Sequence, residues 1–462
     1  MNTYKTFLFS LISIGLWASC KVTKPYQKPD LLVASSYKDV KISDTSNMAG
    51  MKWSEVFTDT VLNQLILHGL AANLDLKIAV ARINEAQAGL RLSKAAFLPG
   101  VSGNVAVKQS RLAFPQGFGM INNSTQYDLG ISSNWELDIW AKLSSAKRAA
   151  YADLLASDAA KRAVQTQLIA DIANHYFELL ALDQQLLVTQ KTAENRAADA
   201  EAIKLLFESS ILNGVAVVQS EANYYEADLA IPDIKQRIKE IEHALCVLLA
   251  RSPSKINRTS LAQQRLTYDL RPGIPAQLLA YRPDVQQAEY QFRAAFENTN
   301  LARASFYPSL TITAAAGFSS LGISNWFSSA GLFGNIAAGL TQPIFNKGIN
   351  KARLSTAESK QQQALYGFEN ALLKAAQEVS DALSSYEFAA QKEEKRGKQL
   401  KALAQAVAFN KELLNNSKNT NYTDVLAAEQ NLLTAELKGI NDQSQKLHAI
   451  VNLYRALGGG WN

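Results

Sequence analysis

Two long stretches of this chain contain no proline, and they restrict its fold more than any other feature. One runs from Gln116 to Ile231 and the other from Ile344 to Asn462. A proline inside a helix costs about 3 kcal/mol, so these stretches predict long uninterrupted helices. The tract from about Lys142 to Phe207 would extend roughly 100 Å at 1.5 Å per residue. Such a helix cannot be the core of a compact globule and needs packing partners along its length.

Apolar residues in these tracts follow heptad spacing. One series near the C-terminus alternates intervals of four and three residues: Leu433, Leu437, Ile440, Ser444, Leu447, Val451 and Tyr454. A similar series in the first tract comprises Val164, Leu168, Ile172, Tyr176 and Leu179. Heptads indicate helices packed side by side, and the many alanines allow close approach on more than one face. A closed cylinder of helices fits this pattern. A simple coiled-coil rod explains the heptads but not the segments between them.

The chain also carries an internal duplication. Phe97-Leu98-Pro99 is matched by Phe306-Tyr307-Pro308 (306 − 97 = 209), and Asp75 is matched by Asp284 at the same offset. Val217, Glu221 and Asn223 are matched by Val425, Glu429 and Asn431 (425 − 217 = 208). Leu137-Asp138-Ile139-Trp140 is matched by Gln342-Pro343-Ile344-Phe345 (342 − 137 = 205). Anchor points in the same order at nearly constant offsets predict two structural repeats.

Each repeat is predicted to contain a helix, two strands and then two very long helices. The first repeat covers residues 61–270, with strands at about 100–112 and 126–140 and long helices to about 250. The second covers residues 271–462, with strands at about 309–320 and 333–345 and long helices to 457. The predicted fold class is therefore α+β, with two repeats in one chain.

The predicted strands alternate strictly between apolar and polar residues. One face of the best example carries Tyr127, Leu129, Ile131, Ser133, Trp135, Leu137 and Ile139. About ten residues with one apolar face, with aromatic residues near the ends, is the pattern of a transmembrane β-strand, although soluble sheets alternate too. Closed bacterial barrels begin at about eight strands, so four strands would have to be shared between chains. Two copies would supply eight strands and three would supply twelve, and the pattern leaves both open.

The N-terminus reads as a secretory signal. Lys5 is followed by an apolar run from Phe7 to Trp17 and then by Ala18-Ser19-Cys20. This predicts a lipoprotein signal peptide over residues 1–19, lipidation of Cys20 and a lipidated segment over residues 20–60. An ordinary secreted protein with a chance cysteine is the alternative, since Trp17 stands where leucine is usual. The other cysteine, Cys246, lies among apolar residues, which predicts a buried structural thiol.

Several functional classes lack support in the sequence. The net charge of +6 is small for 462 residues, and no basic run suggests nucleic-acid binding. Four histidines are scattered without metal-ligand spacing: His68, His175, His243 and His448. We find no phosphate-binding loop and no catalytic constellation, so neither an enzyme, a cofactor nor a metal site is predicted.

Short motifs along the whole mature chain resemble the outer-membrane factor (TolC-like) family, in the lipoprotein branch that serves resistance-nodulation-division efflux pumps. They include Trp53-Ser54-Glu55-Val56-Phe57, Tyr281-Arg282-Pro283-Asp284-Val285, Tyr422-Thr423-Asp424-Val425-Leu426 and Ala456-Leu457-Gly458-Gly459-Gly460-Trp461. The resemblance implies a homotrimer with a twelve-stranded transmembrane β-barrel in the outer membrane and a long-helix α-barrel across the periplasm. The implied duct is passive, anchored to outer-membrane lipid, and joined by a periplasmic adaptor to an inner-membrane transporter of the resistance-nodulation-division class.

The resemblance also implies that two turns between long helices form the periplasmic tips. These turns lie near residues 209–214 and 417–421, and their Gly, Asn and Ser content favours turns independently. Family members usually carry a glycine at each tip that the adaptor engages, whereas this chain has Ser210 and Lys418 there. The candidate adaptor contacts are therefore Ser210, Ile211, Lys418 and Asn419.

The same resemblance singles out Asp424 as a candidate for the periplasmic gate. Family gates hold aspartates just past the second tip; Asp424 matches one such position, and Ala427 occupies another. Three copies of Asp424 around a narrow axis would repel one another and attract cations. The alternative interpretation is that Asp424 only stabilises the start of the last helix, since aspartate favours helix starts.

Two other functions compete with a drug-efflux duct. One is a duct for protein secretion, against which the lipidation site and the Arg282-Pro283-Asp284 motif argue. The other is a lipid-anchored coiled-coil scaffold without a pore, against which the alternating strands argue. The sequence does not distinguish drugs, dyes, detergents, fatty acids and metal ions as exported compounds.

Overall fold

The computed structural model describes residues 22–29, 51–111, 123–210, 212–264, 281–416 and 422–461. The chain divides into two compact units. Unit 1 takes its described residues from Met1–Leu31, Arg82–Ser157 and Gln287–Phe368. Unit 2 takes them from Leu32–Ala81, Asp158–Gln286 and Glu369–Asn462. Each unit therefore contains pieces of both sequence repeats, and the repeat limits themselves stay a prediction.

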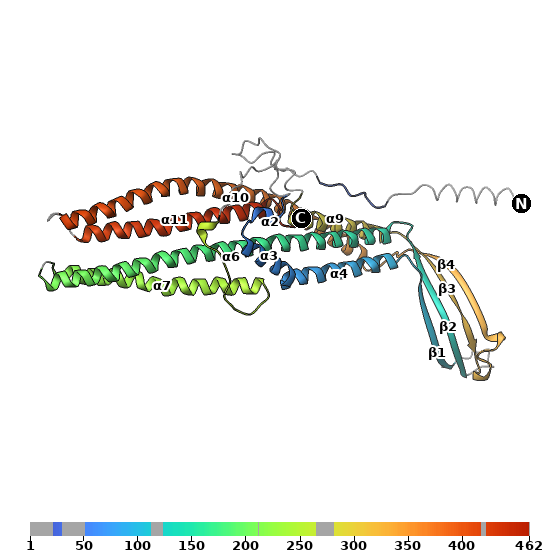
Figure 1. Ribbon diagram of the computed structural model, residues 1–462. Coiled ribbons are helices and arrows are strands. Elements are labelled where there is room, and N and C mark those ends of the chain that lie inside the picture. The colour runs from blue at the N-terminus through green and yellow to red at the C-terminus, as the bar shows by residue number, and fades with distance from the viewer. Residues whose placement is uncertain are drawn as a thin grey trace. The chain divides into compact units, whose positions relative to one another are not determined.

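Unit 1 is built on one antiparallel sheet in the order β1-β2-β3-β4 (Figure 1). Its strands are β1 (Gly100–Arg111), β2 (Asn123–Leu137), β3 (Ser309–Ser320) and β4 (Leu332–Thr341). Two short 3-10 turns, η3 (Ile323–Asn325) and η4 (Ser329–Gly331), connect β3 to β4. The register places Val105 opposite Leu129 and Leu129 opposite Phe318. Because β1 and β4 lie at the two ends of this order, each pairs on one side only among the described strands.

Two strands end earlier than the sequence alternation predicts. The second strand ends at Leu137 instead of about 140, because the Asp138 carboxylate accepts bonds from the amides of Leu143 and Ser144, both at 2.8 Å, and so caps a helix. The fourth strand ends at Thr341 instead of about 345. Pro343 follows closely, and proline has no amide hydrogen to donate to a strand ladder.

The N-terminal segment 22–29 packs on α9 (Pro283–Ala304) within unit 1. The amide of Lys24 donates to the Asn300 side-chain oxygen at 3.0 Å, and the Asn300 side-chain nitrogen donates back to the Lys24 carbonyl at 2.9 Å. Tyr26 lies edge-on to Phe296, with ring centroids 5.6 Å apart. Burial raises the pKa of Tyr26 to about 12. The segment that follows the predicted lipidation site is thus attached to a helix.

Two long helical hairpins and several shorter helices make up most of unit 2, and some of these helices extend into unit 1 (Figure 1). The first pairs α6 (Lys142–Glu208) with α7 (Gly214–Leu248), and the second pairs α10 (Ile349–Asn416) with α11 (Tyr422–Ala456). Shorter elements are α2 (Trp53–Val56), α3 (Thr60–Ala72), α4 (Leu74–Ala95) and η2 (Leu261–Gln263). Within the described ranges, no helix combines the length and apolar character needed to cross a membrane.

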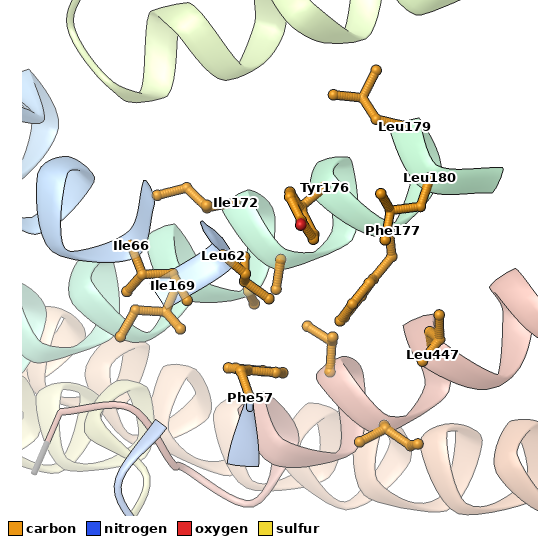
Figure 2. Packing of buried hydrophobic residues seen from close by; sticks show 14 of the residues in the cluster. Phe57, Leu62, Ile66, Ile169, Ile172, Tyr176, Phe177, Leu179, Leu180 and Leu447 are labelled. Carbon is orange, nitrogen blue, oxygen red and sulfur yellow. The ribbon is translucent and has the colours of Figure 1, made fainter. Parts of the chain in front are cut away.

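The apolar core of unit 2 lies where α2 and α3 meet the long helices (Figure 2). Both predicted heptad series contribute to it, through Leu168, Ile172, Tyr176 and Leu179 from α6 and through Ile440, Leu447, Val451 and Tyr454 from α11. The predicted seams are therefore confirmed as packing faces. Full burial of a side chain of this size contributes about 1.5–3 kcal/mol, so this cluster is a main source of stability.

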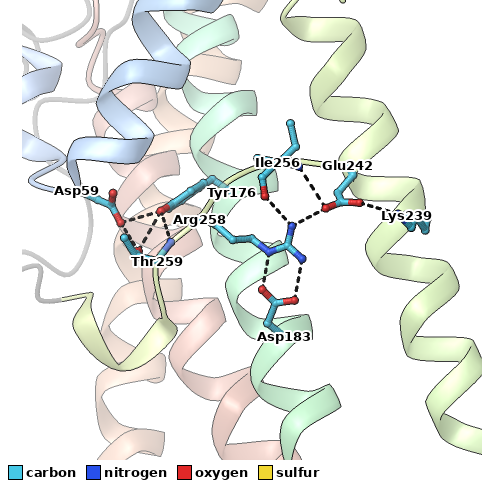
Figure 3. Close-up of polar contacts among 8 residues, drawn as sticks. All are labelled: Asp59, Tyr176, Asp183, Lys239, Glu242, Ile256, Arg258 and Thr259. Carbon is cyan, nitrogen blue, oxygen red and sulfur yellow. Dashed lines mark hydrogen bonds and ion pairs between the residues drawn. The ribbon is translucent and has the colours of Figure 1, made fainter. Parts of the chain in front are cut away.

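Two polar networks tie the segment after α7 to this core (Figure 3). Asp59 caps α3, and its second carboxylate oxygen accepts from the Tyr176 hydroxyl at 2.8 Å and the Thr259 hydroxyl at 2.5 Å. Burial opposes ionisation of Asp59, but its hydrogen bonds outweigh burial and lower its pKa. Arg258 donates to Asp183 at 2.5 and 2.8 Å and to Glu242 at 2.6 Å.

The Arg282-Pro283-Asp284 motif has a structural role in unit 2. The buried Arg282 guanidinium donates to the Ala456 carbonyl and to Glu378, both at 2.8 Å, and to Asp284 at 2.6 Å. Gly458, at φ +84°, lies against it, and a Cβ there would be 3.2 Å from the Arg282 Cα. The motif therefore attaches the start of α9 to the end of α11.

Candidate functional site

The strand register gives the sheet of unit 1 one apolar and one polar face. Pairs such as Val105 with Leu129 and Ile312 with Ala338 lie on the same side, since directly opposed residues share a face. The apolar face carries Val101, Val105, Val107, Leu129, Ile131, Leu310, Ile312, Ile336 and Leu340. The polar face carries Ser102, Asn104, Asp128, Asn134, Thr311, Thr313 and Asn335. All of β4 and almost all of β1 are exposed, whereas β2 and β3 are mostly half-buried.

Aromatic residues gather at the end of the sheet where the strands meet the helices. The Trp135 indole donates to the Phe97 carbonyl at 2.8 Å, and the Trp140 indole donates to the Pro308 carbonyl at 2.8 Å. The Trp140 ring also lies 5.2 Å from Tyr307, centroid to centroid. Each indole therefore fixes the end of one strand against the start of another.

A second aromatic group lies at the opposite end of the sheet. Trp326 contacts Tyr127 with ring centroids 5.6 Å apart and stacks on Phe327 at 5.2 Å. Phe327 in turn lies 5.8 Å from Phe318. The apolar face is thus bounded at both ends by aromatic side chains, which favour the boundary between an apolar phase and water.

The centre of the sheet depends on two facing glycines. Gly130 of β2 pairs with Gly317 of β3 on the polar face. A Cβ at Gly317 would lie 2.1 Å from the Leu129 carbonyl oxygen and 2.6 Å from the Gly130 Cα. These are backbone atoms that cannot rotate away, so the approach of these strands requires glycine at position 317.

The first helix tip lies between α6 and α7. Ser210 is exposed and adopts φ 59°, and its amide donates to the Phe207 carbonyl at 2.8 Å. Asn213 then caps α7 by accepting from the Ala216 amide at 3.2 Å. Of the four candidate adaptor contacts, only Ser210 falls within the described residues. Ile211, Lys418 and Asn419 lie outside them, so their part in a tip stays a prediction.

Asp424 is the third residue of α11 and is exposed. A carboxylate in the first turn is favoured by the partial positive charge of a helix N-terminus, by about 0.3–1 kcal/mol. The neighbouring Val425 and Leu426 are buried. This position fits both a gate residue and a residue that stabilises the helix start, and both interpretations stay predictions.

An apolar cluster just beyond Asp424 joins the two hairpins. Ile203 of α6 and Leu426 of α11 form its buried centre, and partly buried neighbours are Leu212, Ala216, Val217 and Leu414. Val217 and Val425 occupy matching positions of the sequence duplication, and both contribute buried surface at the starts of their helices. The cluster therefore connects the end of α6 with the start of α11.

A buried arginine makes the polar connection between the same hairpins. Arg196 is 5% exposed, donates to the Asn223 carbonyl at 2.7 Å and lies 3.6 Å from Glu226. It also donates to the Gln430 side chain of α11. Sequence reasoning missed Arg196 because its partners lie on other helices, and no local motif surrounds it.

Charged residues next to this arginine are also coupled across helices. Lys411 of α10 pairs with Glu429 of α11 at 2.5 Å, and this hydrogen bond raises the pKa of Lys411. Burial, together with the nearby Glu429 carboxylate, raises the pKa of Asp199 on α6. The duplication identifies Glu429 as a repeated position, and the structure adds its ionic partner Lys411.

The remaining candidates have simple placements. Cys20 lies outside the described residues, so its lipidation stays a prediction. Cys246 is a buried free thiol, as predicted, 3.4 Å from the Ser254 carbonyl. Across the part of the chain that the structure describes, no group of three or more His, Cys, Asp or Glu side chains is placed to hold a metal ion.

A sheet with one apolar and one polar face, joined to paired helices of 35 to 68 residues, is the architecture of an outer-membrane export channel. The sequence matches the outer membrane efflux protein family over residues 65–251 and 274–459, and the chain belongs to that family. It is an outer-membrane component of an efflux system, with a role in transport out of the cell.

Comparisons with known proteins agree along the whole chain. The chain is 29% identical to the probable outer membrane lipoprotein SilC of Salmonella typhimurium, covering 99% of both proteins. It is 30% identical to the solvent efflux pump outer membrane protein SrpC of Pseudomonas putida, covering 98% of both. Its fold resembles the solved outer-membrane channel OprN with a TM-score of 0.88 at 25% identity, covering 96% of this chain and 100% of that one.

Proposed function

We propose that three copies of this chain form one passive exit duct. Each copy would contribute four strands to a twelve-stranded transmembrane β-barrel and its long helices to a tunnel across the periplasm. The observation that carries this proposal is the sheet of unit 1, with an apolar face, a polar face and two edges that no other described strand pairs with. Closure into a barrel gives such edges a partner and leaves no strand unpaired in lipid.

The dimensions of the apolar face suit this role. Tyr127 and Trp135 lie on the same strand and the same face, eight residues apart. At about 3.3 Å per residue their separation along the strand is about 26 Å, which a strand tilt of about 40° reduces to about 20 Å across the membrane, within the apolar band of about 25 Å in outer-membrane barrels. The polar face would then line a water-filled lumen in which serine, threonine and asparagine predominate.

Partners and cargo follow from the efflux role. We propose a periplasmic adaptor at the helix tips, around Ser210, Ile211, Lys418 and Asn419, and an inner-membrane transporter of the resistance-nodulation-division class that supplies the energy. Cys20 would carry the lipid that attaches the chain to the outer membrane. The cargo would be small toxic compounds such as organic solvents and drugs, in line with the solvent efflux named for SrpC. Such a duct needs no cofactor and does not bind nucleic acid.

Growth of a deletion strain tests the proposed function directly. We expect the strain to become sensitive to several amphiphilic drugs, dyes, bile salts or solvents, and the wild-type gene to restore resistance. Sensitivity confined to copper, silver, zinc or cobalt salts would make metal ions the cargo. Unchanged growth on every compound, in a strain without a second duct gene, would contradict the efflux role.

A further inference from the structure

The first repeat supplies strands β1 and β2, and the second supplies β3 and β4. Within the chain, the residues just after β2 pack on the residues just before β3. Trp140, just after β2, donates its indole hydrogen to the Pro308 carbonyl at 2.8 Å, and its ring lies 5.2 Å from the ring of Tyr307, just before β3. This contact holds the exit of β2 beside the start of β3, and it leaves Trp140 only partly exposed.

The matching residues of the duplication are instead largely exposed in the part of the chain that the structure describes. Phe345, which matches Trp140, follows β4 and is 85% exposed, and the neighbouring Ile344 is 98% exposed. Leu98, which matches Tyr307, precedes β1 and is 67% exposed. Exposure of large apolar side chains at both sites indicates two interaction surfaces. Phe345 and Ile344 lie beside one edge of the sheet, at β4, and Leu98 lies beside the other edge, at β1.

We infer that Phe345 and Ile344 of one copy pack against Leu98 and Pro99 of the next copy, repeating between chains the contact that Trp140 makes with Tyr307 and Pro308 within one chain. This inference rests on the proposed trimeric duct. The contact between residues 344–345 of one copy and residues 98–99 of the next is called the joint. The occupant of each exposed site is therefore a second copy of this chain. Six equivalent contacts would alternate around the ring, three within chains and three between them.

The strand register is consistent with the inference. Within the chain, Trp135 lies opposite Ile312, and Ser133 lies opposite Ala314. Adding 205 to the β2 numbers gives positions on β4, and subtracting 209 from the β3 numbers gives positions on β1. The corresponding pairs between copies are Leu340 with Gly103 and Ala338 with Val105. All four shifted residues belong to the apolar face of the sheet. A slip of one residue would instead oppose Leu340 to Ser102 or Asn104, which lie on the polar face.

Cysteine cross-linking of the full-length protein in outer membranes tests this joint. The buried Cys246 is first replaced by serine, and Phe345→Cys is combined with Leu98→Cys. Oxidation is expected to produce bands of dimer and trimer, and none larger, on a non-reducing denaturing gel. The matched control combines Trp140→Cys with Tyr307→Cys, which is expected to link within one chain and to leave the monomer band in place. Each single cysteine variant should form no such bands.

A second cysteine pair separates failure of the joint from failure of the duct. Ala338→Cys with Val105→Cys probes strand pairing between copies in the register given above. If this pair links copies while the pair at positions 345 and 98 does not, the joint is wrong and the shared barrel stands; Phe345 would then face lipid. If neither pair links copies and the native protein is a monomer, the proposed trimeric duct fails as well.

An aromatic exchange gives a measurement that does not depend on cysteines. Phe345→Trp installs the residue that the chain itself uses at Trp140, and we expect the trimer to resist heating in detergent as well as the wild type does. Phe345→Ser should lower the temperature at which the trimer dissociates, while far-ultraviolet circular dichroism of the remaining protein stays helical. Equal heat resistance of both variants and the wild type would overturn the inference.

Discussion

The sheet of unit 1 and the helical core of unit 2 are stabilised in opposite ways. In unit 2, Tyr176, Phe177 and Leu179 are almost fully buried, and the polar groups of Asp59 and Arg258 have partners within the same chain. In unit 1, the strand β4 is exposed along its whole length. The sheet buries little apolar surface of its own, although its register is regular.

One chain therefore contains a helical core that packs within the chain and a sheet that has no comparable packing of its own. The core of unit 2 buries its apolar side chains within one chain, at about 25 cal/mol per Å² removed from water, although Leu187, Phe388 and Phe409 on its long helices stay exposed. In the proposed duct, the sheet would gain comparable burial from lipid on one face and from strands of other copies at its edges. Substitutions in the two regions should therefore fail differently, in folding for unit 2 and in assembly for unit 1.

The largest effect is expected from Gly317→Ala in the sheet of unit 1. The new Cβ would meet the Leu129 carbonyl oxygen at 2.1 Å, so β2 and β3 would have to separate. We expect loss of the heat-resistant trimer and of drug resistance, while the helical content of the protein is retained. Gly339→Ala on β4 is the matched control, because nothing lies within 4 Å of its added Cβ in the chain. Equal trimer yields on unheated gels would contradict a role for the glycine contact.

A smaller but still severe effect is expected from Arg282→Met in the core. The change leaves Asp284 and Glu378 without the guanidinium that both contact. The two carboxylates are 44% and 35% exposed, so the loss should fall below the cost of about 3–5 kcal/mol for a fully buried pair. Urea unfolding followed by circular dichroism should show a clearly lower midpoint. Lys398→Met removes an exposed pair on one helix and should change the midpoint little, since such pairs contribute about 0.3–0.5 kcal/mol.

Asp59→Asn should give a moderate effect that depends on pH. The folded state lowers the pKa of Asp59, so its carboxylate stabilises the protein above its unfolded pKa of about 3.9, and this stabilisation disappears as pH falls through the lower folded value. At neutral pH the variant should lose about 1.5–3 kcal/mol, the contribution of a hydrogen bond to a charged group. Urea midpoints at pH 7, 4 and 3 should show the gap between variant and wild type shrinking towards pH 3. A gap that stays constant would mean that Asp59 does not titrate as inferred.

The smallest effect on stability is expected at the tip, from Asp424→Asn. An exposed residue in a first helical turn should shift the unfolding midpoint little, by about 0.5 kcal/mol or less. If Asp424 forms a ring at a closed gate, planar-bilayer recordings should show reduced preference for cations in Asp424→Asn and unchanged preference in Asp424→Glu. Unchanged conductance and ion preference in both variants would leave Asp424 as a residue that only stabilises the start of α11.

Patterns within single elements predicted much of this fold. The heptad series identified the faces of α6 and α11 that are buried, and strict alternation identified the apolar face of β2. Both signals are local, because the period of a helix or strand decides which side chains share a face. The ends of β2 and β4 were predicted less well, since Asp138 and Pro343 end a strand through a side-chain cap and a missing amide hydrogen.

Contacts between distant helices could not be predicted in the same way. Arg196 bonds Gln430, Arg282 bonds Glu378 and Tyr176 bonds Asp59, and in each case more than ninety residues separate the partners. No periodic signal relates such positions, because they meet only after the helices have packed. The tip residues Ile211, Lys418 and Asn419 and the lipidation site Cys20 stay predictions from the family resemblance and the N-terminal signal.

The two edges of the sheet have a consequence for how copies can associate at all. An edge like β4 that accepts β1 of another copy makes a head-to-tail contact, in which the two surfaces differ. Such a contact leaves one free surface at each end of every intermediate, so growth stops only when the rotation between neighbours returns the last copy to the first. The twist of the four-stranded sheet therefore sets how many copies close the ring. A change in twist would produce rings of the wrong size or open filaments.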